Sequence, residues 1–203
     1  GALNNGIDIS EIAKKRIKYV AKERSLNVLF IGRITKKANL ELLIDAFKIL
    51  NSSKYKLDII GEGPLLNKLR EKVDILEIKH LVNFHGAMKD ENKISKIANN
   101  TSIFIYPGSV GLSLIHAMAY GLPAIVHDNE YHHMPEIAAF KNNLTGMFFK
   151  ENSAQNLSST LVELMKSETL REKMSLNSLK TLEKNFNTEN MSFRFLEFLN
   201  NLT

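Results

Sequence analysis

Between residues 27 and 127, short apolar segments alternate with longer segments of helical periodicity, and this alternation most constrains the fold. Short β-branched runs bounded by Gly or Pro predict buried strands at Asn27–Ile31, Leu57–Ile60, Val82–Phe84, Ser102–Tyr106 and Ala124–Val126. Helices are predicted between them, over Leu40–Leu50, Leu65–Ile78, Glu91–Ala98 and Gly111–Ala119. Strands that alternate with helices and carry no polar face predict an α/β fold, a doubly wound parallel sheet of Rossmann-like type.

The rest of the chain is predicted to flank this sheet. Asn39 is placed as an N-cap and Pro64 as a first helical residue. One helix is predicted near the N-terminus, over Ser10–Glu23. Beyond a polar loop at 127–135, we expect a short last strand at Gly146–Phe149. Three helices should follow it, over Ala154–Met165, Thr169–Lys184 and Glu189–Leu202. Residues 1–25 are predicted to be an interdomain segment and residues 26–203 one domain.

Composition excludes several classes of protein. The 203 residues include no cysteine, which rules out a disulfide framework. The first residues have no signal-peptide pattern and no initiator Met, so we expect a piece cut from a longer chain, located in the cytoplasm or at the inner membrane surface. The net charge is +5, but no RNA-recognition motif accompanies the basic residues, so nucleic acid is not expected as a partner.

The turn after the first predicted strand combines a flexible backbone with cations. Gly32 and Arg33 follow that strand, and Lys36 and Lys37 stand just before the next helix. Ligands of open parallel sheets bind where strands end and helices begin. Arg can hold phosphate oxygens through two parallel hydrogen bonds. The turn is therefore predicted to bind an anion, although a solvated basic turn has the same composition.

The densest signal follows the fourth strand, where Pro107-Gly108-Ser109-Val110-Gly111 opens an apolar helix. Free amide groups and the positive end of the helix dipole bind phosphate at such a position. Helical spacing places a polar stripe along this helix, formed by Ser109, Ser113, His116 and Tyr120. We therefore expect His116 to contact a ligand. The alternative is that His116 is a satisfied core residue, as a lone histidine in a buried helix usually is.

Histidines and acids also gather after the fifth strand. The group contains His127, Asp128, His132, His133 and Glu136. Their spacing matches no standard metal motif, because adjacent His132 and His133 point in different directions, so no metal site is predicted. Glu136 follows Pro135 and is interpreted as a first-turn helix acid that caps the helix or contacts a ligand.

The order of these segments resembles the C-terminal domain of retaining GT-B glycosyltransferases of the group 1 class, family four. The resemblance extends from about Asn5-Gly6-Ile7-Asp8 to about residue 185. Its motifs are Phe30-Ile31-Gly32-Arg33-Ile34, Asn39 to Phe47, Leu57 to Pro64, Val82 to Gly86, Gly111-Leu112 to Pro123, Pro135-Glu136-Ile137 and Thr145-Gly146. Each motif is weak alone, but their order and spacing together are specific.

The resemblance implies roles for these residues in binding a nucleoside-diphosphate sugar. Arg33 would contact the diphosphate, Gly111 and Leu112 would cradle phosphate and sugar, and His116 would lie near the ribose, with Gly86 near the base. Gly32, Gly108, Ser109, Ser113 and Glu136 complete the predicted donor site. The sequence departs from the family where two glutamates often stand, at Gly108 and His116, and at Ala38, where Lys36 or Lys37 would have to replace a phosphate-binding lysine.

By this resemblance, the protein would transfer a sugar from a nucleoside-diphosphate sugar to an acceptor with retention. The resemblance also implies a role in the synthesis of cell-surface glycans. Arg33, Lys37 and the helix N-terminus would stabilise the leaving diphosphate without an obligatory metal or cofactor. The acceptor-binding N-terminal domain would be missing, so the fragment alone is expected to be inactive, and any membrane association would occur through that domain. Two alternatives remain: a non-catalytic nucleotide-binding module, or another GT-B enzyme such as a nucleotide-sugar epimerase.

Overall fold

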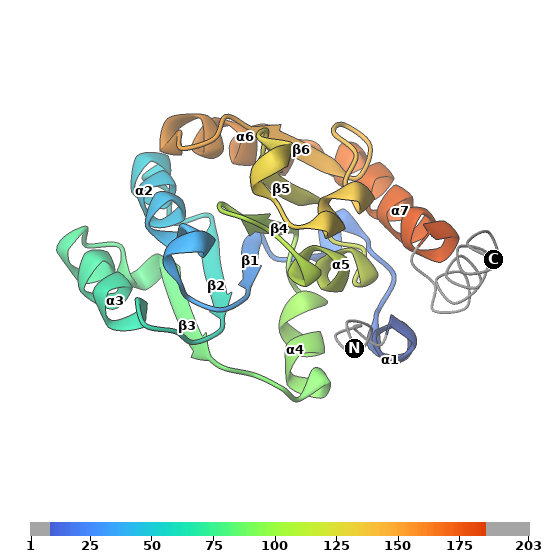
Figure 1. The fold of residues 1–203 in the computed structure, drawn as a ribbon, viewed down its shortest axis with the longest axis horizontal. Helices are drawn as coiled ribbons and strands as arrows, with labels where there is room; N and C mark the ends of the chain where they lie inside the picture. The colour runs from blue at the N-terminus through green and yellow to red at the C-terminus, as the bar shows by residue number, and fades with distance from the viewer. Residues whose placement is uncertain (1–8, 186–203) are drawn as a thin grey trace, which may run out of the picture.

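Six parallel strands form one sheet in the order β3-β2-β1-β4-β5-β6 (Figure 1). The computed structural model describes residues 9–185. Its strands are β1 (Asn27–Ile31), β2 (Lys56–Ile60), β3 (Val82–Gly86), β4 (Ile103–Tyr106), β5 (Ala124–His127) and β6 (Gly146–Phe149). All five strand pairings are parallel, and the register pairs Val28 with both Leu57 and Ile103. The predicted doubly wound α/β fold is confirmed.

Helices cover both faces of the sheet. They are α1 (Ile9–Lys15), α2 (Leu40–Leu50), α3 (Leu66–Ile75), α4 (Glu91–Ala98), α5 (Leu112–Ala119), α6 (Ala154–Lys166) and α7 (Glu168–Asn185). α2 packs against α3 and α6, whereas α5 packs against α1 and α7. Right-handed crossovers place α2 and α3 on one face and α4 and α5 on the other, because the chain reverses its direction across the sheet after β3. The two long C-terminal helices then divide between these faces.

The central strands are buried because helices cover them on both sides. All four residues of β4 and of β5 are buried, and most of α5 is buried as well. The edge strand β3 is more exposed, and only Val82 in it is buried. α2 buries the face predicted from its apolar spacing, including Leu43 and Phe47. The core therefore surrounds β1, β4 and β5, whose carboxyl ends carry the candidate site.

The predicted N-terminal helix Ser10–Glu23 is wrong beyond Lys15. α1 ends there, the chain continues without helical structure, and a 3₁₀ turn forms at Ala21–Glu23. Hydrogen bonds to distant segments hold this extended stretch. Nη1 of Arg16 donates to the carbonyl of Ala119 at 3.0 Å, and the Tyr19 hydroxyl donates to the carbonyl of Ser102 at 2.7 Å. These tertiary contacts override the local helical pattern.

Two predicted helix starts also need correction. Asn39 does precede α2, but its backbone is left-handed with a φ of 51°, and its side chain does not cap the helix. Pro64 lies two positions before the first residue of α3, Leu66, and so is not the first helical residue. α3 ends at Ile75 rather than Ile78, because Glu77 adopts a left-handed φ of 58°. Capping was predicted from residue type alone, whereas the loop geometry decides it.

Smaller differences concern the ends of other elements. β2, β3 and β5 extend one or two residues beyond the predicted bounds, β4 begins one residue later, and α5 begins at Leu112 with Gly111 as its N-cap. α6 and α7 occur as predicted within one residue of their bounds. Residues Glu189–Leu202, predicted as a helix, lie outside the described residues.

Candidate functional site

The strand order identifies the edge of the sheet where a ligand can bind. β1 lies between β2 and β4, so the chain leaves β1 and β4 toward opposite faces. In an open parallel sheet, this reversal leaves a crevice outside the carboxyl ends of the two strands. The turns that follow β1 and β4 contain Gly32–Asn39 and Pro107–Gly111, the two segments that the sequence marked as anion-binding. The structure therefore brings these two segments together at the reversal.

The turns after β1, β2 and β3 continue the hydrogen bonding of the sheet. The amide of Gly32 donates to the carbonyl of Ile60 at 3.0 Å, and the amide of Gly61 donates to Gly86 at 2.8 Å. A β-carbon on Gly61 would lie 1.9 Å from the carbonyl oxygen of Gly32, so only glycine fits there. This close packing fixes the backbone from which Arg33 projects.

Arg33 is exposed, and its side chain has no hydrogen-bonding or ionic partner among residues 9–185. An arginine on a rigid turn beside the crevice is available to an incoming anion.

Gly86 ends β3 with a φ of 72°, and a β-carbon there would approach only the Glu62 carboxylate, at 3.6 Å. The surroundings of Gly86 are thus open enough for a ligand to approach its backbone.

Lys37 lies in a short 3₁₀ turn, Lys36–Ala38, that packs directly on the loop after β4. Its carbonyl accepts a hydrogen bond from the amide of Ser109 at 3.0 Å. A β-carbon on Gly108 would lie 1.9 Å from that carbonyl oxygen. Ala38 is fully buried, whereas Lys36 and Lys37 are exposed. Glycine at 108 is therefore required by this packing.

The loop between β4 and α5 is held at Val110 by the segment after β5. The amide of Val110 donates to Nδ1 of His133 at 3.2 Å, and its carbonyl accepts from the amide of Met134 at 2.9 Å. Nε2 of His133 lies 3.0 Å from the carbonyl of His127. Because a carbonyl only accepts, Nε2 carries the proton, and Nδ1 is the acceptor. A neutral His133 thus connects the loop to the end of β5.

Gly111, Leu112 and Ser113 form the start of α5, where the first amide groups have no partner within the helix. Leu112 is exposed and Ser113 is half-buried, so this helix start is accessible. Glu136 lies beside it in the 3₁₀ turn Pro135–Ala139, which makes it the predicted first-turn acid. A β-carbon on Gly111 would be 3.5 Å from Oε2 of Glu136, an atom that is buried and has no hydrogen-bonding partner.

His116 faces α4 from the middle of α5. Its Nε2 lies 3.0 Å from Oε1 of Glu91, and the Tyr120 hydroxyl donates to the same oxygen. Burial, followed by the hydrogen bond to Glu91, raises the pKa of Tyr120. His116 and Tyr120 thus share one face, as the stripe predicted, but Ser109 contacts Lys37 instead. Glu91 could not be recognised as a site residue from local sequence, because it pairs with His116 across 25 residues.

A second group of polar residues surrounds a cavity of about 320 Å³ beside Gly108 and Ser109, and of this group the sequence analysis missed Glu151. His127, His132 and Glu151 line this cavity, with Lys36, Lys37 and Asn152. Nδ1 of His132 lies 2.7 Å from Oε1 of Glu151. Burial lowers the pKa of His127 to about 4, with neighbouring His133 adding to the effect. Among residues 9–185, no cluster of His, Asp and Glu side chains has the arrangement of a metal site.

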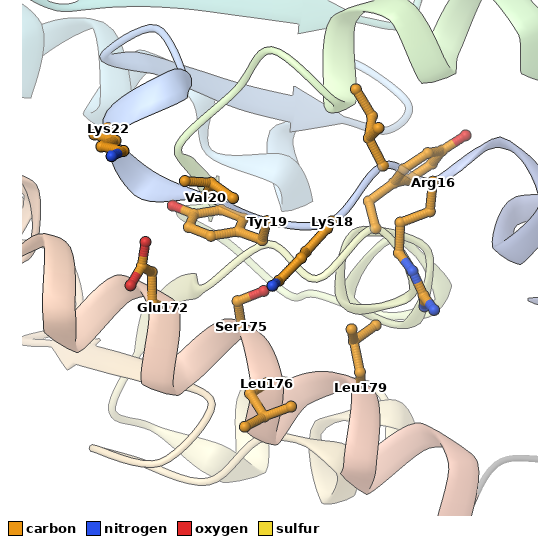
Figure 2. A pocket seen from close by; sticks show the side chains of 11 residues that line it. Arg16, Lys18, Tyr19, Val20, Lys22, Glu172, Ser175, Leu176 and Leu179 are labelled. Atoms are coloured by element: carbon orange, nitrogen blue, oxygen red, sulfur yellow. The ribbon is translucent and has the colours of Figure 1, made fainter.

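A larger cavity, of about 700 Å³, lies between residues 16–22 and α7 (Figure 2). Tyr19 in its wall bonds to Ser102, which immediately precedes β4. This cavity therefore lies near the amino ends of the strands, away from the crevice. Ligands of this fold class bind at the carboxyl ends, so the cavity is not the candidate donor site.

Comparison with known proteins assigns the chain to a family. Residues 11–181 match the family model described as Glycosyl transferases group 1. The chain belongs to this family. It is 27% identical over 159 residues to the amylovoran biosynthesis glycosyltransferase AmsK of Erwinia amylovora, covering 73% of this chain and 38% of that protein. The chain spans about two fifths of the length of the first curated relatives that it matches.

Solved structures share the fold of this group 1 glycosyltransferase chain. Staphylococcus aureus TarM, solved with fondaparinux, α-GlcNAc-glycerol and UDP, superposes with a TM-score of 0.78 at 18% identity, covering 90% of this chain and 36% of TarM. The C-terminal domain of LpcC from Francisella tularensis gives a TM-score of 0.73 at 19% identity, covering 90% of this chain and 100% of that domain. Within residues 9–185, no helix has both the length and the apolar character needed to cross a membrane.

Proposed function

We propose that this chain binds a nucleoside-diphosphate sugar in the crevice between the ends of β1 and β4, as the donor-binding half of a retaining glycosyltransferase. The observation that carries the proposal is the meeting of the partnerless Arg33 turn and the accessible start of α5 at the reversal of strand order. Both groups suit a diphosphate, one through its cation and the other through its amides and dipole. The UDP present with TarM is consistent with this ligand class.

The remaining candidate residues receive roles in the same proposal. Arg33 and Lys37 stabilise the charge that develops on the leaving diphosphate, without a metal ion. The backbone at Gly111 and Leu112 cradles phosphate, and Gly86 lies near the base. His116 approaches the ribose, with Glu91 holding its ring. The backbone at Gly108 and the side chains of Ser109, Ser113 and Glu136 border the donor.

We further propose that the whole enzyme contributes to the synthesis of cell-surface glycans. The name of AmsK, which refers to amylovoran biosynthesis, supports this wider role. An acceptor-binding half would close over the crevice, so the present chain binds donor but does not transfer sugar alone. Exclusion of water by that closure is needed before the preorganised cations act at full strength.

Calorimetry with UDP, GDP, ADP and CMP tests the donor site. Binding of one diphosphate is expected, and Arg33→Ala should weaken it about tenfold or more, because hydrogen bonds to charged groups contribute about 1.5–3 kcal/mol. Lys173→Ala, which removes an exposed cation from α7, is the matched control and should leave binding unchanged. Equal affinities for the Arg33 variant and the parent would contradict the proposed site.

A further inference from the structure

The cavity of about 700 Å³ between residues 16–22 and α7 has more cations than acids in its wall (Figure 2). Its cations are Arg16, Lys18 and Lys22. Among the described residues, the one acid in the wall is Glu172, whose Oε1 already accepts a hydrogen bond from the amide of Ala21 at 3.0 Å. Lys18 and Lys22 are exposed and form no ion pair or hydrogen bond in the part of the chain that the structure describes. Both cations are therefore available to a ligand.

Two further cations, Arg24 and Arg171, are buried behind this wall, at 7% and 1% exposed. Cζ of Arg24 lies 4.3 Å from the ring centre of Tyr19, which lines the cavity. Burial raises the pKa of Tyr19, and the positive charges of Arg171 and Arg24 oppose that rise. Within residues 9–185 neither arginine pairs with an acid, and their hydrogen bonds go to main-chain carbonyls near the ends of α4 and α6. Because charge of one sign along a cleft attracts ions of the opposite sign, the cavity favours an anion.

The rest of the wall is mainly apolar. Its apolar residues include Ile17, Tyr19, Val20, Leu176 and Leu179. Ile17 and Leu176 are 60% and 52% exposed, so their side chains leave apolar surface in contact with water. At about 30 Å³ per water molecule, the cavity volume corresponds to roughly twenty heavy atoms. A ligand with an apolar body would remove this surface from water, which is favourable in proportion to the area covered.

We propose that this cavity binds a small organic anion in which a phosphate or carboxylate group is joined to an alkyl body. Lys18, which projects into the cavity from the segment opposite α7, contacts the anionic group (Figure 2). Leu176 and Leu179 contact the alkyl body. A nucleotide fits this wall less well, because the leucines cannot pair with the polar groups of its base and ribose. The proposal does not rest on the proposed function, since the cavity shares no residue with the candidate donor site.

Backbone NMR of the isotope-labelled chain tests the proposal. Decyl phosphate and decanoate are titrated below the concentrations at which they form micelles. At least one should give saturable shifts of the amide signals of residues 16–22 and 172–179, and leave residues 32–37 and 108–113 unchanged. Decyl maltoside, which has the same chain but no charge, should give no saturable shift. Inorganic phosphate, which has no apolar body, should bind about tenfold more weakly than decyl phosphate or less tightly still.

Substitutions separate the two parts of the site. Lys18→Gln should weaken binding of the alkyl anion about tenfold, because it removes the cation that contacts the head group. Lys14→Gln removes an exposed cation of α1 that does not line the cavity and should leave binding unchanged. Leu176→Ser should weaken the alkyl anion but not inorganic phosphate, whereas Ile75→Ser, which removes an exposed apolar side chain from α3, should change neither.

Three results would overturn the proposal. The first is the absence of saturable shifts with both alkyl anions in a folded sample. The second is equal affinity for decyl maltoside, which would show that the cations have no role. The third is a set of shifts confined to residues 32–37 and 108–113, which would place the anion in the crevice. Failure of nucleotides to bind in calorimetry would contradict the proposed function alone, because none of these titrations uses a nucleotide.

Discussion

The histidines around the end of β5 have different roles because their surroundings differ. Both ring nitrogens of His133 are used, one toward Val110 and one toward the carbonyl of His127, so this ring is neutral. The ring of His127 stacks on that of His133 with centroids 3.8 Å apart. His132 is mostly exposed and pairs with Glu151. A buried His127 and a half-buried His133 therefore stack as neutral rings, while His132 pairs with Glu151 at the surface beside them.

His127 makes the stability of the fold depend on pH. Its pKa in the folded protein is about 4, below the ordinary value of 6.5, because burial disfavours the charged ring. As pH falls below about 6.5, the unfolded chain takes up a proton that the folded chain does not. The free energy of unfolding is therefore expected to fall between pH 6.5 and about 4, by on the order of 3 kcal/mol, and then to level off.

Urea unfolding at a series of pH values measures this effect as a difference between two proteins. His127→Phe keeps a ring on His133 but cannot take up a proton. As pH falls through the same range, the wild type should lose more unfolding free energy than the His127→Phe variant does. A difference that stays constant with pH would show that His127 does not cause the loss.

At the level of elements, the most consequential contact joins the Lys36–Ala38 turn to the loop after β4. From sequence, Gly108 was interpreted as a position that had lost a side chain used on the donor. The structure gives it a packing role, because the Lys37 carbonyl occupies the space of a β-carbon. A contact between residues so far apart in the chain could not be recognised from local sequence.

Gly108→Ala should therefore separate the two loops. Its β-carbon would meet a backbone oxygen at 1.9 Å, and relief of that contact is expected to cost about 1–3 kcal/mol of stability. Denaturant unfolding measures this loss. Ser109→Ala, at the next residue, keeps the amide that bonds to Lys37 and should change stability by less than about 0.5 kcal/mol. Equal effects from both variants would contradict the packing role.

The sequence predicted the elements well wherever local pattern and tertiary packing agree. Every predicted strand is present, because buried parallel strands need continuous apolar runs and each run is flanked by turn residues. The prediction failed at Arg16–Val20. There Arg16 bonds to Ala119, 103 residues later in the chain, and Tyr19 bonds to Ser102, 83 residues later, and these contacts exist only in the folded protein. Glu91 and Glu151 were missed for the same reason, since their partners are distant in sequence.

At the scale of the whole molecule, the two edges of the sheet have different properties. The carboxyl edge carries the partnerless Arg33, the start of α5 and the cavity beside Gly108. The amino edge carries the larger cavity, which Tyr19 and residues of α7 line (Figure 2). Volume alone would favour the amino edge, whereas strand topology favours the carboxyl edge. The two criteria make opposite predictions about where a nucleotide protects the backbone.

Hydrogen exchange measured with and without the bound nucleoside diphosphate decides between the two edges. Because a ligand stabilises the segments it contacts, exchange is expected to slow in residues 32–39, 85–90 and 108–114, at the carboxyl edge. Residues 16–24 and 172–179, around the amino-edge cavity, should exchange at unchanged rates. Arg33→Ala should remove most of the protection at the same nucleotide concentration. Protection confined to residues 16–24 and 172–179 would place the nucleotide at the other edge and exclude the crevice between β1 and β4.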